Sequence, residues 1–212
     1  INHQTQAGIK ETVLTGVHLG GYGKDLSTDL HALIKTILRD TDVPRLRLGS
    51  LEPWDLHEDF LQLFENHRLM PHLHLSLQAM DDMVLKRMKR RHTRSAGFSV
   101  VERVRAARPD IAIGADLIAG FPTETDEMFF NTYDAVRSLQ LTHLHVFPYS
   151  VRKGTPAAKM PNVPSEIIKS RAATLRDAGD QEFVKLRMSQ EGSVANVPVS
   201  YTHLTLPTIL IL

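Results

Sequence analysis

The sequence contains no cysteine among its 212 residues. Disulfide bonds and metal sites built on thiolate ligands are therefore excluded for this chain. It has no apolar run of about 18 residues or more, so we expect no membrane-spanning helix. The formal net charge is only +1, which does not by itself indicate a nucleic-acid-binding protein. The 42% of hydrophobic residues can nevertheless support a sizeable core.

Both ends of the chain differ from its middle. The first residues include neither a starting Met nor the apolar core of a signal peptide, and they have a helical pattern. The last residues, 199–212, resemble the translation of a transposase adapter from sequencing libraries, so we leave them out of the fold prediction. We therefore expect a piece of a longer protein.

Five short β-rich runs alternate with segments that carry apolar residues at helical spacing. The runs cover residues 11–17, 45–51, 72–78, 111–120 and 142–150. A further helix is expected from Ser165 to about Gln190. Strands that alternate with helices are typical of βα units and a parallel sheet. The sequence therefore predicts an α/β fold.

The run 72–78, "HLHLSLQ", alternates leucine with polar residues. Successive side chains of a strand point to opposite faces, so the polar residues share one face. The other runs repeat this pattern, and their polar or small faces carry Arg45, Arg47, Gly114, Asp116, Gly120, His143, His145 and Tyr149. A closed eight-stranded barrel fills its interior with branched apolar residues. A polar inner face instead indicates a wider, open barrel that binds a polar ligand; the alternative is a set of ordinary hydrogen-bonded buried groups.

The strand ends carry further signals, because parallel α/β folds bind ligands at the C-terminal ends of their strands. A glycine-rich turn covers 15–23, and the turn "AGFPTET" covers 119–125. The run "KRMKRRHTR" (86–94) contains six Lys or Arg and follows the strand that ends at Gln78. This position favours contact with an anionic ligand or an RNA backbone, and the alternative is a solvated helix face.

The pairs His72/His74 and His143/His145 are candidate metal ligands, since each pair has both rings on one strand face. They lie where their strands begin, whereas a metal site is expected where the strands end. Their position therefore argues against metal binding.

Six stretches occur in a characteristic order: "TGVHLGGYGKDL", "LRLGSLEP", "PHLHLSLQ", "DDMVLKRMKRRHT", "IGADLIAGFPTETDEMF" and "THLHVFPYSVRKGTPAAKMP". Over about residues 8–197 they resemble the radical S-adenosylmethionine (SAM) methylthiotransferases, in particular the subfamily that modifies threonylcarbamoyladenosine beside the tRNA anticodon. The resemblance implies a partial, open TIM-type βα barrel that lacks its first strand. Residues 1–161 would form the barrel, with strands two to six. Residues 162–198 would form a helical segment leading to a missing RNA-binding TRAM domain, and 199–212 a non-native tail.

The resemblance also implies an activity. Members of the family use SAM and two 4Fe–4S clusters to methylthiolate C2 of N6-threonylcarbamoyladenosine. The cysteines that hold the clusters are absent from this chain, so we expect the chain alone to be inactive. Further implications are the tRNA anticodon stem-loop as substrate, an electron donor such as flavodoxin or ferredoxin, a monomeric full-length form, a cytoplasmic location and no contact with a membrane.

Matching motifs imply which residues contact SAM, and none is assigned as catalytic or as a metal ligand. These residues are Gly20, Gly21, Ser50, Ser76, Gln78, Arg90, Arg91, Asp116 and Gly120. Gly20 and Gly21 would contact the methionine moiety of SAM. Ser50, Ser76 and Gln78 would line the middle of the site, and Arg90 or Arg91 would pair with the SAM carboxylate. Asp116 and Gly120 would lie near adenine. The family commonly has glycine where this chain has Met80, so we expect a strained or obstructed turn there.

Two other hypotheses remain open on the sequence. One is a metal-dependent barrel hydrolase that uses the histidine pairs. The other is a non-catalytic remnant that only binds RNA or SAM.

Overall fold

The computed structural model describes residues 1–194 and 197, and the predicted tail, 199–212, lies outside them. Its five strands are β1 (Glu11–Leu14), β2 (Arg45–Leu48), β3 (His72–Gln78), β4 (Ala112–Ala119) and β5 (Leu144–Pro148). β1 pairs with β2, β3 pairs with β4, and β4 pairs with β5, always in parallel. Two isolated parallel bridges, Leu46 with Leu69 and Leu51 with Leu75, connect the chain around β2 to the chain around β3. The strands therefore follow one another in chain order, and the prediction of an open α/β barrel is confirmed.

Helices fill the connections between the strands, and one further helix stands before the first strand and one after the last. They are α1 (Asn2–Gln6), α2 (Leu30–Asp40), α3 (Glu58–Gln62), α4 (Asp82–Arg87), α5 (Arg94–Ala107), α6 (Asp126–Ser138) and α7 (Ser165–Ser189). Short 3-10 turns cover η1 (Leu19–Gly21), η2 (Pro53–Asp55), η3 (Leu63–Glu65) and η4 (Pro156–Lys159). Five of the helices begin at a side chain that accepts a hydrogen bond from the first turn, namely Asp29, His57, Asp81, Thr93 and Thr125. Such caps satisfy backbone N–H groups that have no partner within the helix, which fixes the starting residue.

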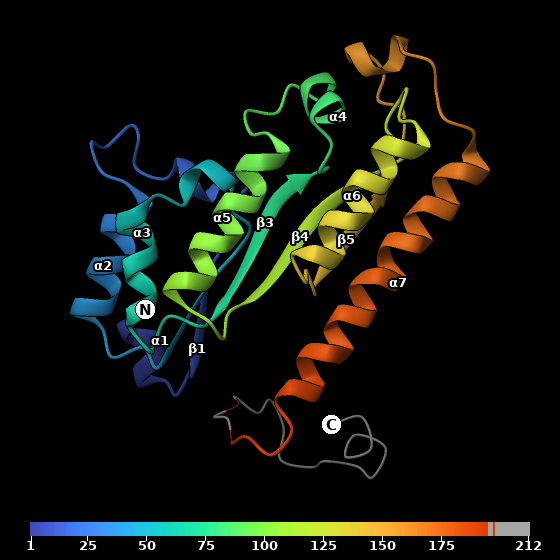
Figure 1. Ribbon diagram of the computed structural model, residues 1–212. Helices are drawn as coiled ribbons and strands as arrows, with labels where there is room; N and C mark the ends of the chain where they lie inside the picture. Colours follow the sequence, from blue (N-terminus) through green and yellow to red (C-terminus); the bar gives the residue numbers. More distant parts are fainter. Residues whose placement is uncertain (195–196, 198–212) are drawn as a thin grey trace.

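The hydrophobic core lies between the helices and one face of the strands. Leu73, Leu75 and Leu77 of β3 are fully buried there, as are Ile113 and Leu117 of β4. Helices α3, α5 and α6 lie over this face (Figure 1). Burying one such side chain contributes about 1.5–3 kcal/mol, so the leucines of "HLHLSLQ" determine which face of β3 turns inward.

Helix α7 packs beside β4, β5 and α6, and belongs to the same core (Figure 1). Its Ala172, Leu175 and Ala178 are buried, and Gly179 leaves room for the side chain of Leu144. The helix predicted from Ser165 is confirmed, while the domain boundary after residue 161 stays a prediction. Among the described residues, no helix combines the length and the hydropathy needed to cross a membrane.

Candidate functional site

A cavity of about 330 Å³ lies where β3 and β4 end. Its walls include Gln78 at the end of β3, Ile118 and Phe121 at the end of β4, Arg90 after α4, and Pro156 of η4. In Figure 1, α4 sits just beyond the arrowhead of β3. A larger cavity of about 490 Å³ lies at the opposite end, beside Ile111 and the C-terminal half of α7. We place the candidate site in the first cavity because parallel α/β folds bind ligands where strands end.

The cavity contains backbone strain at Gln78. This residue has a φ of +64°, and a register irregularity separates it from Leu75 in the pairing with β4. A left-handed conformation costs a residue with a Cβ about 1–2 kcal/mol. Such strain is concentrated at functional sites, where the surrounding structure enforces it. Lys89, on the facing wall, has a φ of +58°.

Met80 itself has no positive φ and does not line the cavity. Met80 is fully buried, and its N–H donates to Oγ1 of Thr132 at 3.0 Å. Its thioether packs against Gly97 of α5, where a Cβ would come within 2.8 Å of the methionine Cε. The positive φ falls on Gln78 instead. Met80 therefore anchors the turn in the core, outside the residues that line the cavity.

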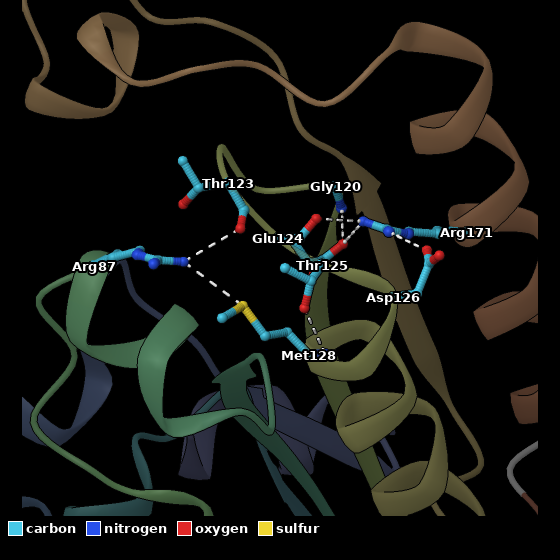
Figure 2. A network of polar contacts seen from close by, with 8 residues as sticks. All are labelled: Arg87, Gly120, Thr123, Glu124, Thr125, Asp126, Met128 and Arg171. Carbon is cyan, nitrogen blue, oxygen red and sulfur yellow. Dashed lines mark hydrogen bonds and ion pairs between the residues drawn. The ribbon is translucent and has the colours of Figure 1, made fainter.

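A buried ion pair supports the turn after β4 (Figure 2). The N–H of Gly120, which has a φ of +73°, donates to Oε2 of Glu124 at 2.9 Å. Arg171 of α7 donates to the same oxygen at 2.8 Å and to the Glu124 carbonyl at 3.0 Å. Burial raises the pKa of Glu124, while the Gly120 N–H and the Arg171 guanidinium act in the opposite direction. Helix α7 thus fixes the loop that begins at Gly120.

The same loop is connected to α4 on its other side (Figure 2). Arg87 donates to the carbonyl of Thr123 at 3.3 Å and contacts the sulfur of Met128 at 3.6 Å. Thr123 also has a positive φ, +67°. Two walls of the cavity, α4 and the loop after β4, are therefore joined by direct contacts.

The two arginines predicted to contact SAM have different surroundings. Arg90 lines the cavity, donates to the Ser76 carbonyl at 2.9 Å and forms an ion pair with Glu52. Burial raises the pKa of Glu52, and the charge of Arg90 lowers it. Arg91 is exposed and lies 5.6 Å from the centre of the Trp54 ring. Arg90 alone of the two reaches the cavity, and its guanidinium is already partly engaged.

The other predicted residues are spread over two parts of the barrel. Gln78 and Arg90 line the cavity, and Gly120 lies directly before Phe121 of its wall. Gly20 and Gly21 form η1 near β1, where a Cβ on Gly20 would collide with the Asp55 carboxylate. Ser50 is exposed after β2. The sequence did not single out the apolar lining residues Ile118 and Met88, although the alternation places Ile118 on the face of Asp116.

The polar strand face forms a connected cluster further down the barrel. Nε2 of His74 lies 3.0 Å from Oδ1 of Asp116, and Nδ1 of His145 lies 3.1 Å from the same oxygen. Burial raises the pKa of Asp116, but the hydrogen bonds and charges of the two histidines outweigh it and lower the pKa. One row below, the rings of His72 and His143 are 5.5 Å apart. Burial, with the charge of nearby Arg47, lowers the pKa of His72 to about 4.

Comparison with known proteins agrees with this architecture. Residues 3–136 match the family model described as the Radical SAM superfamily. The chain is 43% identical over 219 residues to the threonylcarbamoyladenosine tRNA methylthiotransferase MtaB of Rickettsia prowazekii, covering 99% of this chain and 52% of that protein. It is 36% identical over 207 residues to a tRNA-2-methylthio-N(6)-dimethylallyladenosine synthase of Geobacillus kaustophilus, covering 96% and 39%. The chain thus spans about half or less of the length of these curated relatives.

A solved structure supports the fold independently. The radical S-adenosylmethionine methyltransferase TsrM of Kitasatospora setae matches with a TM-score of 0.55 and 18% identity, over 69% of this chain and 28% of that one. At this low identity the match is evidence for the fold alone. The family match, the resemblance in six ordered stretches and the open parallel barrel agree, and the chain belongs to the radical SAM superfamily.

Proposed function

We propose that this chain forms the SAM-binding barrel of a tRNA methylthiotransferase that acts on C2 of N6-threonylcarbamoyladenosine. The observation that carries the proposal is the cavity at the ends of β3 and β4, with strained Gln78 on one wall and the Gly120 loop on another. The radical SAM family implies SAM and an iron–sulfur cluster as cofactors. The relative with 43% identity has this activity in its name.

The residues around the cavity fit SAM. Ile118 and Phe121 offer apolar surface for the adenine, and the Gln78 amide offers donors and an acceptor for the ribose hydroxyls. Arg90 offers a charge-assisted hydrogen bond to the carboxylate, in competition with Glu52. The other residues implied by the resemblance remain predicted SAM contacts, namely Gly20, Gly21, Ser50, Ser76, Arg91, Asp116 and Gly120.

An iron–sulfur cluster does not fit the residues of this chain. Such clusters are held by cysteine thiolates, and the sequence has none. We therefore assign no step to a cluster and expect the chain alone to be inactive. The two 4Fe–4S clusters, the electron donor such as flavodoxin or ferredoxin, the monomeric full-length form and the cytoplasmic location remain predictions for the parent protein.

The basic run 86–94 is proposed to contact the tRNA anticodon stem-loop. Of its six cationic residues, Arg87, Arg90 and Arg94 are half-buried and bonded within the chain. Lys86, Lys89 and Arg91 are exposed. Exposed cations beside the site suit contact with phosphates, which would weaken as salt rises.

A chimera tests the proposed function in a complete protein. Residues 8–190 of this chain would replace the matching segment of the Rickettsia prowazekii relative, which supplies the rest of the protein. The purified chimera, with reconstituted clusters, would be incubated with SAM, a chemical reductant and tRNA containing N6-threonylcarbamoyladenosine. Mass spectrometry of the digested nucleosides should detect the 2-methylthio product. A matched chimera carrying Gln78→Ala should bind SAM more weakly while its clusters stay intact.

Two outcomes would contradict the proposal. A chimera that holds its clusters and cleaves SAM but leaves the nucleoside unmodified would exclude this substrate. A chimera that modifies only tRNA containing N6-dimethylallyladenosine would move the chain to the other subfamily among its relatives.

A further inference from the structure

His74, Asp116 and His145 come from three adjacent strands. Asp116 is the direct register partner of His145, and His74 pairs with Gly114, two residues before Asp116. The three potential ligand atoms lie within 4.8 Å of one another, and both imidazole nitrogens point to the same carboxylate oxygen. The strand pairing of the barrel, rather than a local motif, creates this convergence.

Two imidazoles and one carboxylate form a donor set for borderline divalent metals. Zinc bonds to histidine nitrogen and carboxylate oxygen at about 2.0–2.2 Å, and the same set with open positions binds non-haem iron. An ion among three such donors leaves neighbouring ligand atoms roughly 3–4 Å apart. The hydrogen-bond distances of 3.0 and 3.1 Å at Asp116 already lie in that range, and all three ligand atoms lie within 4.8 Å of one another. We propose that His74, Asp116 and His145 bind one divalent first-row transition-metal ion, of the Zn²⁺ or Fe²⁺ class.

Burial suits an open site better than a closed structural one. The side chains of His74 and Asp116 are 7% and 18% exposed, whereas that of His145 is 63% exposed. Two ligands are thus held in place by their surroundings, and the third is open to solvent, so a water or another oxygen ligand can complete the coordination. Gly114 contributes space, because a Cβ there would come within 2.6 Å of Nδ1 of His74.

The charges around the cluster permit a cation. On β2, Arg47 lies near His72 and His143 in the row below the cluster, and its Nε donates to Glu11 at 3.2 Å. Glu11 also pairs with Arg45, so one carboxylate is shared by two guanidinium groups and offsets the charge of Arg47 only in part, while Asp116 gives the cluster a negative charge of its own. The sequence argued against the histidine pairs as ligands because they open their strands, but Asp116 joins one histidine of each pair in mid-barrel.

The three ligands lie outside the residues that line the proposed SAM cavity, and Asp116 alone of them is also a predicted SAM contact. Gln78 lies four residues beyond His74 on β3, which corresponds to about 13 Å along the strand. Ile118 lies two residues beyond Asp116, about 7 Å further. The inference rests on the three ligands and does not depend on the proposed function.

Metal titration of the whole chain tests the inference. The protein would carry a tag without histidine, and Co²⁺ would serve as the probe because its visible d–d absorption reports nitrogen and oxygen ligation. We expect one equivalent of Co²⁺ to bind, Zn²⁺ to displace it, and His145→Ala and Asp116→Asn to weaken binding at least tenfold. His31→Ala is the matched control, since His31 lies outside the polar strand face, with its ring centre 6.1 Å from that of His57.

Circular dichroism of each variant without metal shows whether the variant is folded before its metal binding is measured. Because His145 is mostly exposed, His145→Ala should keep the wild-type fold, and it decides the question if Asp116→Asn does not fold. Absence of a stoichiometric Co²⁺ complex would overturn the proposal. Binding of equal strength in His145→Ala would also overturn it, because the metal would then sit on other histidines.

Discussion

Arg171 tests how helix α7 holds the loop after β4. Its side chain is 7% exposed and that of Glu124 only 2%. The substitution Arg171→Met keeps much of the aliphatic length and removes the charge. It would leave the Glu124 carboxylate buried, with the Gly120 N–H at 2.9 Å as a remaining donor.

The expected loss is large because one partner of a buried pair stays behind. Removing one member of such a pair costs about 3–5 kcal/mol in free energy of unfolding, and the remaining Gly120 bond favours the lower end. The double variant Arg171→Met/Glu124→Gln removes both charges and should recover most of the loss. Asp126→Asn is the matched control: Asp126 contacts Arg171 at 2.6 Å, but its side chain is 85% exposed, so we expect less than about 1 kcal/mol.

Urea unfolding at pH 7, followed by circular dichroism, measures these differences. Arg171→Met should also regain part of its lost stability as the pH falls towards 5. Burial already raises the pKa of Glu124, and loss of the cation raises it further, so the folded variant takes up a proton more readily than the unfolded chain. The reasoning fails if Arg171→Met lies within about 1 kcal/mol of wild type, or if the double variant is no more stable than the single one.

Three further predictions concern single residues. Gln78→Gly should relieve the positive φ and raise the free energy of unfolding by up to about 1 kcal/mol, while SAM binding, measured by calorimetry on the reconstituted chimera, weakens. Gly120→Ala should cost more than about 2 kcal/mol in urea unfolding, because its φ is +73° and the new Cβ would lie 2.5 Å from Ile168. Burial and the charge of Arg47 lower the pKa of His72 from 6.5 to about 4 in the folded chain. As the pH falls, the unfolded chain therefore takes up a proton on His72 before the folded chain does. The free energy of unfolding, measured by urea, should therefore fall by up to about 3 kcal/mol between pH 6.5 and 4. The variant His72→Gln should not show this loss.

Most of the fold could be predicted from local pattern. Alternation with period two marks β3 and β4, and the apolar stripe from Leu30 to Leu38 marks α2. The ends of elements were less predictable: β1 stops at Leu14, although the apolar pattern continues to Val17. Strand length depends on which neighbours offer hydrogen bonds, and β2, the partner of β1, ends at Leu48.

Site residues were predictable only where a local feature marks them, either a turn that needs a particular backbone conformation or a place on a polar strand face. Gly120 could be found because a turn after a strand favours glycine, and Gln78 because it closes a polar face. The ion pair between Glu124 and Arg171 spans 47 residues, so no local pattern predicts it. The place of Met80 is not predictable from local sequence for the same reason, since it depends on Gly97 and Thr132 in distant helices.

The polar lumen residues also specify the barrel in which they lie. A slip of one residue between β3 and β4 would turn Asp116 towards the leucines and Leu117 towards the lumen, because side chains alternate along a strand. Burying that carboxylate without partners costs several kcal/mol, in addition to the apolar burial lost on the other face. In the observed register Asp116 instead meets His74 and His145. The polar residues of the lumen therefore disfavour a β3–β4 pairing that is shifted by one residue. Loss of Asp116 should make the strand register less specific and weaken ligand binding.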